Sequence, residues 1–145
     1  MINTRNFYID GAWVAPFEGT DLPVFNPATE EPYATISLGG AADAEAAIAA
    51  ARRSFPSWSM TTPAERGEVL RAILAVYEAR AADMAEAIST EMGAPIDMAL
   101  SDQAGAGRSH LKAFIRALDA FEWQRPMRPG TEGQDLVFEA AGVAG

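Results

Sequence analysis

The feature that most constrains this sequence is a helix signal that runs from Thr62 to Gly93. Thr62 and Glu65 are spaced so that each side chain can accept a hydrogen bond from the other's backbone amide, as in a capping box. Pro63 follows at the first helical position, where its missing N–H leaves no bond unmade. Gly93 is a natural helix end, since glycine adopts the left-handed conformation there without steric cost. A chain with this segment must contain a helical layer.

Apolar residues at helical spacing mark one face of this segment. They are Val69, Leu70, Ile73, Leu74, Tyr77, Ala81, Met84, Ala85 and Ile88. So long a helix is unusual in a globular domain, so we expect a kink or break between Arg80 and Asp83.

Two more helices are predicted. Residues 41–55 have Asp43 near the start and Arg52 and Arg53 near the end, which complements the helix dipole. Pro56 is expected to stop this helix, and Trp58 to be a buried anchor after it. The third helix starts at about Pro95 or Ser101 and ends at Glu122. Gly105 and Gly107 weaken its first half by about 1 kcal/mol each, which suggests that another backbone comes close.

The ends of the chain are expected to be extended. Asp10-Gly11 between two short apolar runs, residues 7–9 and 12–14, predicts a tight hairpin. Val24-Phe25 and residues 33–38 read as further strands, separated by turn residues. Residues 123–133 read as a loop, and Leu136 to Glu139 as a strand. Residues 142–145 read as the first residues of another strand that is cut short.

The composition of the chain argues against several kinds of function. The net charge is −9, which disfavours nucleic acid and anionic membranes as partners. No apolar run approaches the roughly 20 residues of a membrane span, and there is no signal peptide at the start, so a cytoplasmic protein is expected. The absence of cysteine excludes disulfides and thiolate metal sites. Many of the apolar residues are alanine, which favours a helical scaffold with a thin core.

Isolated polar residues favour no catalytic site. His110 is the only histidine, and its neighbour Ser109 would point about 100° away on a helix, so the two form no dyad. Gly39-Gly40 precedes a helix but lacks the spacing and the lysine of a phosphate-binding loop. It is interpreted as a plain turn.

Six landmarks nevertheless follow one another in an informative order. They are residues 8–13 (YIDGAW), 24–30 (VFNPATE), 49–58 (AAARRSFPSW), 63–66 (PAER) with Leu70, 90–95 (TEMGAP) and 142–145 (GVAG). In this order they resemble the N-terminal part of the aldehyde dehydrogenase superfamily, and the resemblance covers essentially the whole chain.

The resemblance implies an α/β parent fold. This stretch would supply its mainly α-helical part, with three to four helices, short N-terminal hairpin strands and a C-terminal strand. Residues 1–122 would form hairpin strands and the helical part of the cofactor-binding domain. Residues 123–141 would form the loop and strand of an oligomerisation arm, and residues 142–145 would begin the first strand of the nucleotide-binding fold.

The family oxidises aldehydes to carboxylic acids with NAD or NADP through a cysteine thiohemiacetal. Its oxyanion asparagine, cofactor-binding segments, glutamate and cysteine lie beyond residue 145, so no catalytic or cofactor-binding residue can be assigned here. Some members bind a monovalent cation at positions that correspond to Phe25, through its carbonyl, and Glu91. The parent is expected to be a homo-oligomer that acts on a small aldehyde.

Two hypotheses therefore stand. In the first, the chain is the N-terminal fragment of a NAD(P)-dependent aldehyde dehydrogenase, inactive alone and without a bound cofactor. In the second, it is a stand-alone, non-catalytic helical module that binds a partner protein through an exposed apolar face.

Overall fold

The computed structural model describes residues 4–130 and 133–142. Its helices are α1 (Ala41–Ser59), α2 (Pro63–Ala79), α3 (Ala81–Met92), α4 (Ile96–Met98), the π-helix η1 (Ala99–Ala104) and α5 (Gly105–Ala120). Its strands are β1 (Phe7–Ile9), β2 (Ala12–Val14), β3 (Thr20–Asn26), β4 (Glu31–Leu38), β5 (Gln124–Pro126) and β6 (Asp135–Val137). The prediction of a mainly helical chain with short strand pairs is confirmed.

The strands form three separate antiparallel ribbons, β1–β2, β3–β4 and β5–β6. The predicted first hairpin is present, with Asp10 and Gly11 at φ values of 56° and 79°, as its tight turn requires. The second ribbon is longer than predicted, because β3 begins at Thr20 and β4 at Glu31. Its turn is tied by Asn26, whose Oδ1 accepts a hydrogen bond from the Ala28 amide at 2.8 Å.

The prediction that Pro56 stops the first helix is wrong. α1 continues through Pro56 to Ser59, so Arg52 and Arg53 do not lie in its last turn. Proline removes one hydrogen bond from a helix. Serine hydroxyls donate to carbonyls around it, Ser54 to Ala50 at 3.2 Å and Ser57 to Ser54 at 3.1 Å.

Trp58 is also not the buried anchor that was predicted. It lies within α1 and is 47% exposed. Because the helix does not end at Pro56, Trp58 lies on the surface of α1 instead of in a connection that packs into the core.

The predicted start, break and end of the long helical segment are confirmed. The Thr62 hydroxyl accepts a hydrogen bond from the Glu65 amide at 3.2 Å, and Glu65 Oε2 accepts one from the Thr62 amide at 2.7 Å. Arg80 leaves helical geometry at φ −111° and ψ 16° and separates α2 from α3. Gly93 ends α3 at φ 77°.

The third helical region begins after Pro95, the earlier of its two predicted starts, and ends at Ala120 rather than Glu122. Its first part contains the π-helix η1, which was not predicted. The close neighbour at Gly107 is a side chain rather than a backbone: a Cβ there would lie 2.8 Å from the Tyr77 Cζ atom. At Gly105 the nearest atom would be the Leu100 carbonyl oxygen, at 3.7 Å.

The C-terminal part differs from the prediction in two respects. Residues 124–126, which were interpreted as loop, form β5 and pair with β6. The predicted last strand is present but ends at Val137 instead of Glu139. Gly142 has no regular structure, and the rest of the predicted strand over 142–145 lies outside the described residues.

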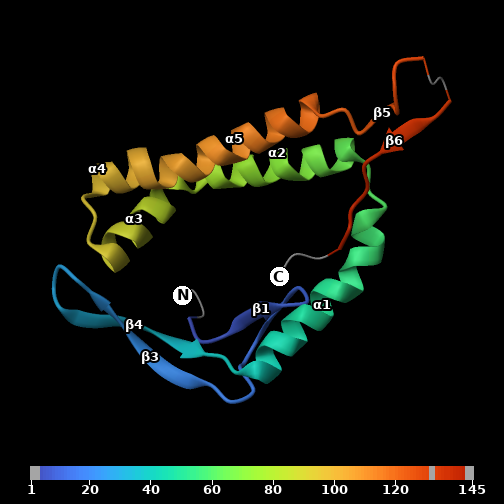
Figure 1. The fold of residues 1–145 in the computed structure, drawn as a ribbon. Coiled ribbons are helices and arrows are strands. Elements are labelled where there is room, and N and C mark those ends of the chain that lie inside the picture. Colours follow the sequence, from blue (N-terminus) through green and yellow to red (C-terminus); the bar gives the residue numbers. More distant parts are fainter. Residues whose placement is uncertain (1–3, 131–132, 143–145) are drawn as a thin grey trace.

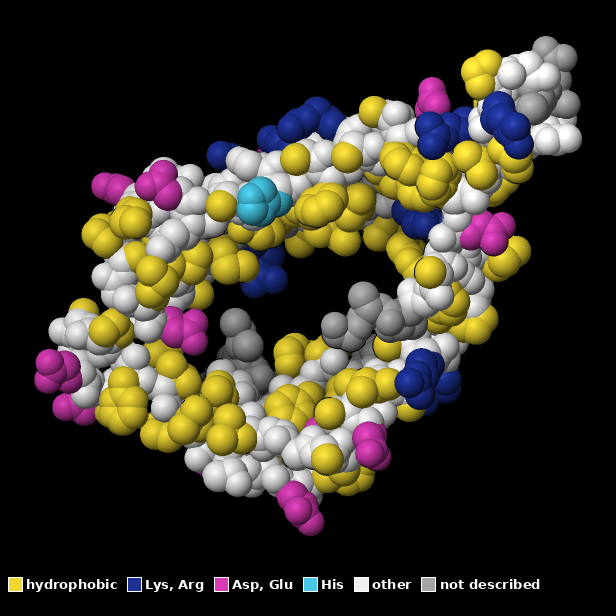
Figure 2. Space-filling view, viewed as in Figure 1, with side chains coloured by type: hydrophobic (Ala, Val, Ile, Leu, Met, Phe, Trp, Pro, Cys, Tyr) yellow, Lys and Arg dark blue, Asp and Glu magenta, His cyan; other side chains and the backbone are white. Residues whose placement is uncertain are grey.

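The described elements enclose an opening (Figures 1 and 2). The ribbons β1–β2 and β3–β4 lie along one side, α1 rises along another, and the α2–α5 pair closes the top (Figure 1). The core is thin, as predicted: one buried cluster consists of Ala85, Ala94 and Ala99, with Ile88 packed against it. None of the described helices has the length and hydropathy to cross a membrane.

Candidate functional site

The predicted cation ligands lie on two elements that meet. Phe25 belongs to β3, next to an irregularity in register between Val24 and Phe25, and opposite Pro32 of β4. Glu91 lies in the last turn of α3, and α3 contacts β3. Burial raises the pKa of the Tyr33 hydroxyl, and the nearby Glu91 carboxylate raises it further. The structure therefore brings the end of α3 to the ribbon that carries Phe25.

The contact between these elements depends on a glycine. A Cβ at Gly93 would lie 2.8 Å from the Pro27 Cγ atom, so α3 and the β3–β4 turn approach as closely as they do only because residue 93 has no side chain. Within residues 4–130 and 133–142, no three His, Asp or Glu side chains group together as metal ligands. Any cation here would therefore depend on backbone carbonyls in addition to Glu91.

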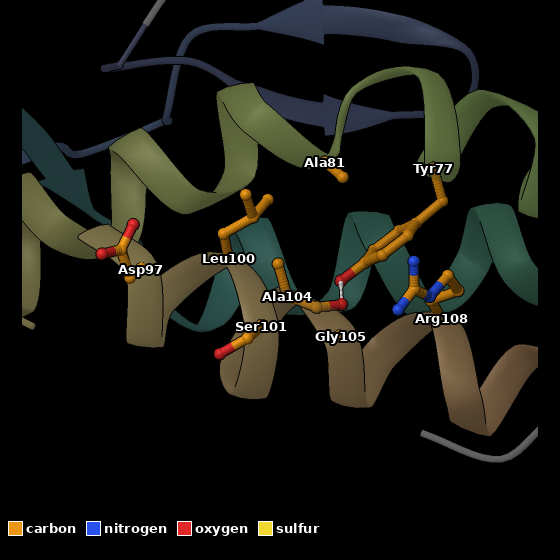
Figure 3. A pocket seen from close by; sticks show the side chains of 8 residues that line it. All are labelled: Tyr77, Ala81, Asp97, Leu100, Ser101, Ala104, Gly105 and Arg108. Carbon is orange, nitrogen blue, oxygen red and sulfur yellow. Dashed lines mark hydrogen bonds between the residues drawn. The ribbon is translucent and has the colours of Figure 1, made fainter. Parts of the chain in front are cut away.

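A hollow of about 500 Å³ with a mixed polar and apolar lining lies where α2 meets η1 and α5. Tyr77 crosses it and donates a hydrogen bond from its hydroxyl to the Ala104 carbonyl at 2.9 Å (Figure 3). Arg108 lies beside Tyr77, and Asp97 lies at the opposite end (Figure 3). The Ser101 hydroxyl donates to Asp102 at 3.0 Å. Asp102 is the next residue of η1, and no histidine lines the hollow, so the hollow contains no serine–histidine pair.

Two larger hollows are apolar. The first, here called the elbow, has a volume of about 690 Å³ and lies along α2 and α3, where the break at Arg80 bends the two helices. Its apolar lining includes Val69, Ile73, Val76 and Met84, each more than 40% exposed. The second, of about 530 Å³, runs between α2, α5 and the segment after β6, and Phe114, 68% exposed, lies on its lining. Exposed apolar area of this extent is typical of a surface that another body covers.

The remaining candidates have structural roles. The Ser109 hydroxyl donates to the Gly105 carbonyl at 3.0 Å, which leaves it no relation to His110. The Gly40 amide donates to the Asp43 carboxylate at 2.9 Å, so Gly40 is the N-cap residue of α1 and forms no phosphate-binding loop. Sequence reasoning missed that Asp43, 6% exposed, also accepts a hydrogen bond from the Phe17 amide at 3.0 Å. Asp43 thereby ties the segment before β3 to the start of α1.

These structural roles do not identify the protein, but comparison with known proteins does. The protein-family model described as the aldehyde dehydrogenase family matches residues 13–145. The chain belongs to the aldehyde dehydrogenase family.

Individual members of the family give the extent of the match. A 3-succinoylsemialdehyde-pyridine dehydrogenase from a Pseudomonas species is 39% identical over 146 residues, which cover 100% of this chain and 30% of that protein. A crystal structure of aldehyde dehydrogenase from Bartonella henselae has a TM-score of 0.86 and 48% identity, over 91% of this chain and 28% of that one. A mutant of aldehyde dehydrogenase C from Pseudomonas syringae, complexed with NAD+ and octanal, has a TM-score of 0.83 and 38% identity, over 86% of this chain and 26% of that one.

This aldehyde dehydrogenase chain spans about 30% of the length of the curated relatives that it matches. It contains no cysteine. The match therefore establishes the family and the fold of this portion, and it assigns no reactive group to any residue of the chain.

Proposed function

We propose that this chain is the scaffold portion of a NAD(P)-dependent aldehyde dehydrogenase and that it catalyses nothing by itself. The observation that carries the proposal is the absence of cysteine from a family member that spans about 30% of its relatives. Covalent oxidation of an aldehyde in this family depends on a thiolate nucleophile, and this chain contains none. NAD or NADP would be held by the parts of the enzyme that this chain lacks.

The apolar elbow is consistent with a chain that acts as a scaffold. Residues 1–122 would form the hairpin strands and the helical part of the cofactor-binding domain, with the elbow as the face that contacts the rest of that domain. Residues 123–141, which include β5 and β6, would form an arm that adds to a neighbouring subunit of a homo-oligomer. Small aldehydes are the proposed substrates, since one homologue was crystallised with octanal.

The test is a chimera. This chain alone and the Bartonella henselae enzyme, with its matching segment replaced by this chain, are each assayed with octanal and NAD+ by NADH absorbance. We expect no turnover from the chain alone and turnover from the chimera. A Val76→Asp variant of the chimera, which places a charge in the elbow, should lose activity, whereas Glu45→Gln on exposed α1 should retain it. NADH formation by the isolated chain would overturn the proposal.

The monovalent cation site remains a separate proposal, supported by the approach of Glu91 to the ribbon that carries Phe25. We expect sodium or potassium chloride to raise the melting temperature of the chain more than tetramethylammonium chloride at equal ionic strength. Glu91→Gln should abolish that difference, because it removes the charged ligand. Equal effects of the salts on the unmodified chain would rule the site out.

A non-catalytic interaction module is the second candidate. It is favoured by the two apolar hollows, because neither contains a catalytic group and both can receive a partner. An inactive chimera that still folds would favour this candidate over the scaffold.

A further inference from the structure

The ribbon β5–β6 leaves the helices at Trp123. It lies past the end of α5, next to the start of α2 (Figure 1). The Trp123 carbonyl accepts a hydrogen bond from the Phe138 amide at 3.0 Å, and the Trp123 indole N–H donates to the Leu118 carbonyl of α5 at 3.4 Å. Trp123 therefore closes the base of the ribbon and joins it to the end of α5.

Three aromatic rings pack against one another at this base. The centre of the Phe121 ring lies 4.8 Å from that of Trp123 and 5.2 Å from that of Phe138, and both pairs meet edge to face. Contacts of this kind define the orientation of the rings as well as their distance. A contact between this cluster and another element therefore sets the position of the whole ribbon.

Such a contact comes from Arg66 of α2. Its guanidinium carbon lies 5.9 Å from the centre of the Trp123 ring, within reach of a cation–π interaction. The same guanidinium donates from Nε to the Thr61 hydroxyl at 3.1 Å and from Nη2 to the Thr61 carbonyl at 2.6 Å. Thr61 is tied to α1, because its amide and its hydroxyl donate to the Trp58 carbonyl at 3.1 Å and 2.7 Å. One planar group thus connects the end of α1, the start of α2 and the base of the ribbon.

Arg66 differs in its contacts from Arg71, the other arginine of α2. Arg71 bonds to the carboxylates of Glu68 and Asp119, whereas no carboxylate among the described residues forms an ion pair with Arg66. The Arg66 guanidinium bonds along its edge to Thr61 and stacks on Trp123, a combination that needs a planar fork and that an ammonium group does not offer. Its contacts are therefore those of a spacer between elements.

We propose that Arg66 is the positioning residue of the β5–β6 ribbon and holds it, through Thr61 and Trp123, in a fixed orientation to α1 and α2. A ribbon whose orientation is already set loses less conformational entropy when it pairs with another chain. That use of the ribbon rests on the proposed arm, whereas the positioning by Arg66 depends only on residues of this chain.

The absence of cysteine allows a direct test. Spin labels on Gln134→Cys, next to β6, and on Ala75→Cys in α2 report the orientation of the ribbon from two exposed positions. Labelled chain is diluted in unlabelled chain, so that only distances within one molecule are measured. We expect one narrow distance distribution. Arg66→Gln should increase the population at other distances about fivefold, because it removes the cation–π contact and the bonds to Thr61. An unchanged distribution would overturn the proposal.

The matched control is Arg71→Gln. It removes a guanidinium from the same helix and breaks two ion pairs, but it leaves the contacts of Arg66 with Thr61 and Trp123 in place. Its distances should stay as in the parent chain. Equal broadening in Arg66→Gln and Arg71→Gln would mean general loosening and would also overturn the proposal.

Thr61→Val tests the same connection from its other end. It keeps the shape of the side chain and removes the hydroxyl to which Arg66 bonds, so it should displace the ribbon by a smaller factor. If Arg66→Gln fails to fold, Thr61→Val alone decides, and unchanged distances in that variant would refute the positioning role.

The proposed arm is tested separately, by deleting residues 124–137 from the chimera and measuring its mass by size-exclusion chromatography with light scattering. A displaced ribbon in Arg66→Gln together with an unchanged mass of the shortened chimera would confirm the role of Arg66 and contradict the arm.

Discussion

At the scale of single residues, two glycines of α5 have opposite roles. Gly107 makes room for Tyr77, whose hydroxyl satisfies the Ala104 carbonyl at the end of the π-helix. A π-helix frees carbonyls that a regular helix would pair, so this hydrogen bond replaces a lost backbone bond. Gly105 makes room for no side chain, so nothing offsets the helix propensity that a glycine loses relative to alanine.

The two glycines therefore predict opposite mutational effects. Gly105→Ala should raise the free energy of unfolding by about 0.5–1 kcal/mol, the gain in helix propensity. Gly107→Ala should lower it, because the Tyr77 ring must move and give up a hydrogen bond worth about 1 kcal/mol. Urea denaturation followed by circular dichroism measures both. If both variants gain stability, Tyr77 does not need the space at Gly107.

At the scale of elements, α2 and α5 are held side by side by ion pairs on one side of their contact. Arg71 reaches Asp119 at 2.7 Å, and Lys112 reaches Glu78 at 2.7 Å. The Lys112 ammonium, which bonds to the carboxylate, lowers the pKa of Glu78 below its ordinary value of 4.5. Both pairs are largely exposed, so salt screens them and each contributes only modestly.

The direction of this shift predicts a pH dependence. A lowered pKa in the folded state means that Glu78 stabilises the fold above its ordinary pKa of 4.5 and that this contribution is lost as pH falls through the lowered value. Glu78→Gln should therefore be less stable than the parent chain at neutral pH, and the difference should shrink on acidification below 4.5. Urea midpoints over this pH range test it. Glu86→Gln on α3 is the control and should not show this convergence. A constant difference for Glu78→Gln would contradict the assignment.

At the scale of the whole molecule, the chain has much surface and little core. Its buried hydrophobic residues are almost all alanines, whereas large residues such as Ile73, Val76 and Phe114 are 47% to 68% exposed. Large exposed apolar patches destabilise an isolated monomer in water and favour contact with another body. This imbalance agrees with a chain that spans about 30% of its relatives.

Much of the fold could be predicted because it depends on local chemistry. The capping box at Thr62, the break at Arg80, the end at Gly93 and the Asp10-Gly11 turn each involve residues a few positions apart. One error arose where a distant group decides, because β5 formed by pairing with β6. Another was Pro56, which stayed inside α1, and the hydrogen bonds around it do not explain why.

The sequence by itself determined the family, the order of helices and strands, and the lack of a sulfur nucleophile, since these depend on residue identity and short-range spacing. Only the tertiary structure decided that Tyr77 needs Gly107, that Asp43 joins two segments, and that Gly93 lies against Pro27. Those contacts join residues far apart in the chain. They depend on how the helices are placed in space, which no local pattern specifies.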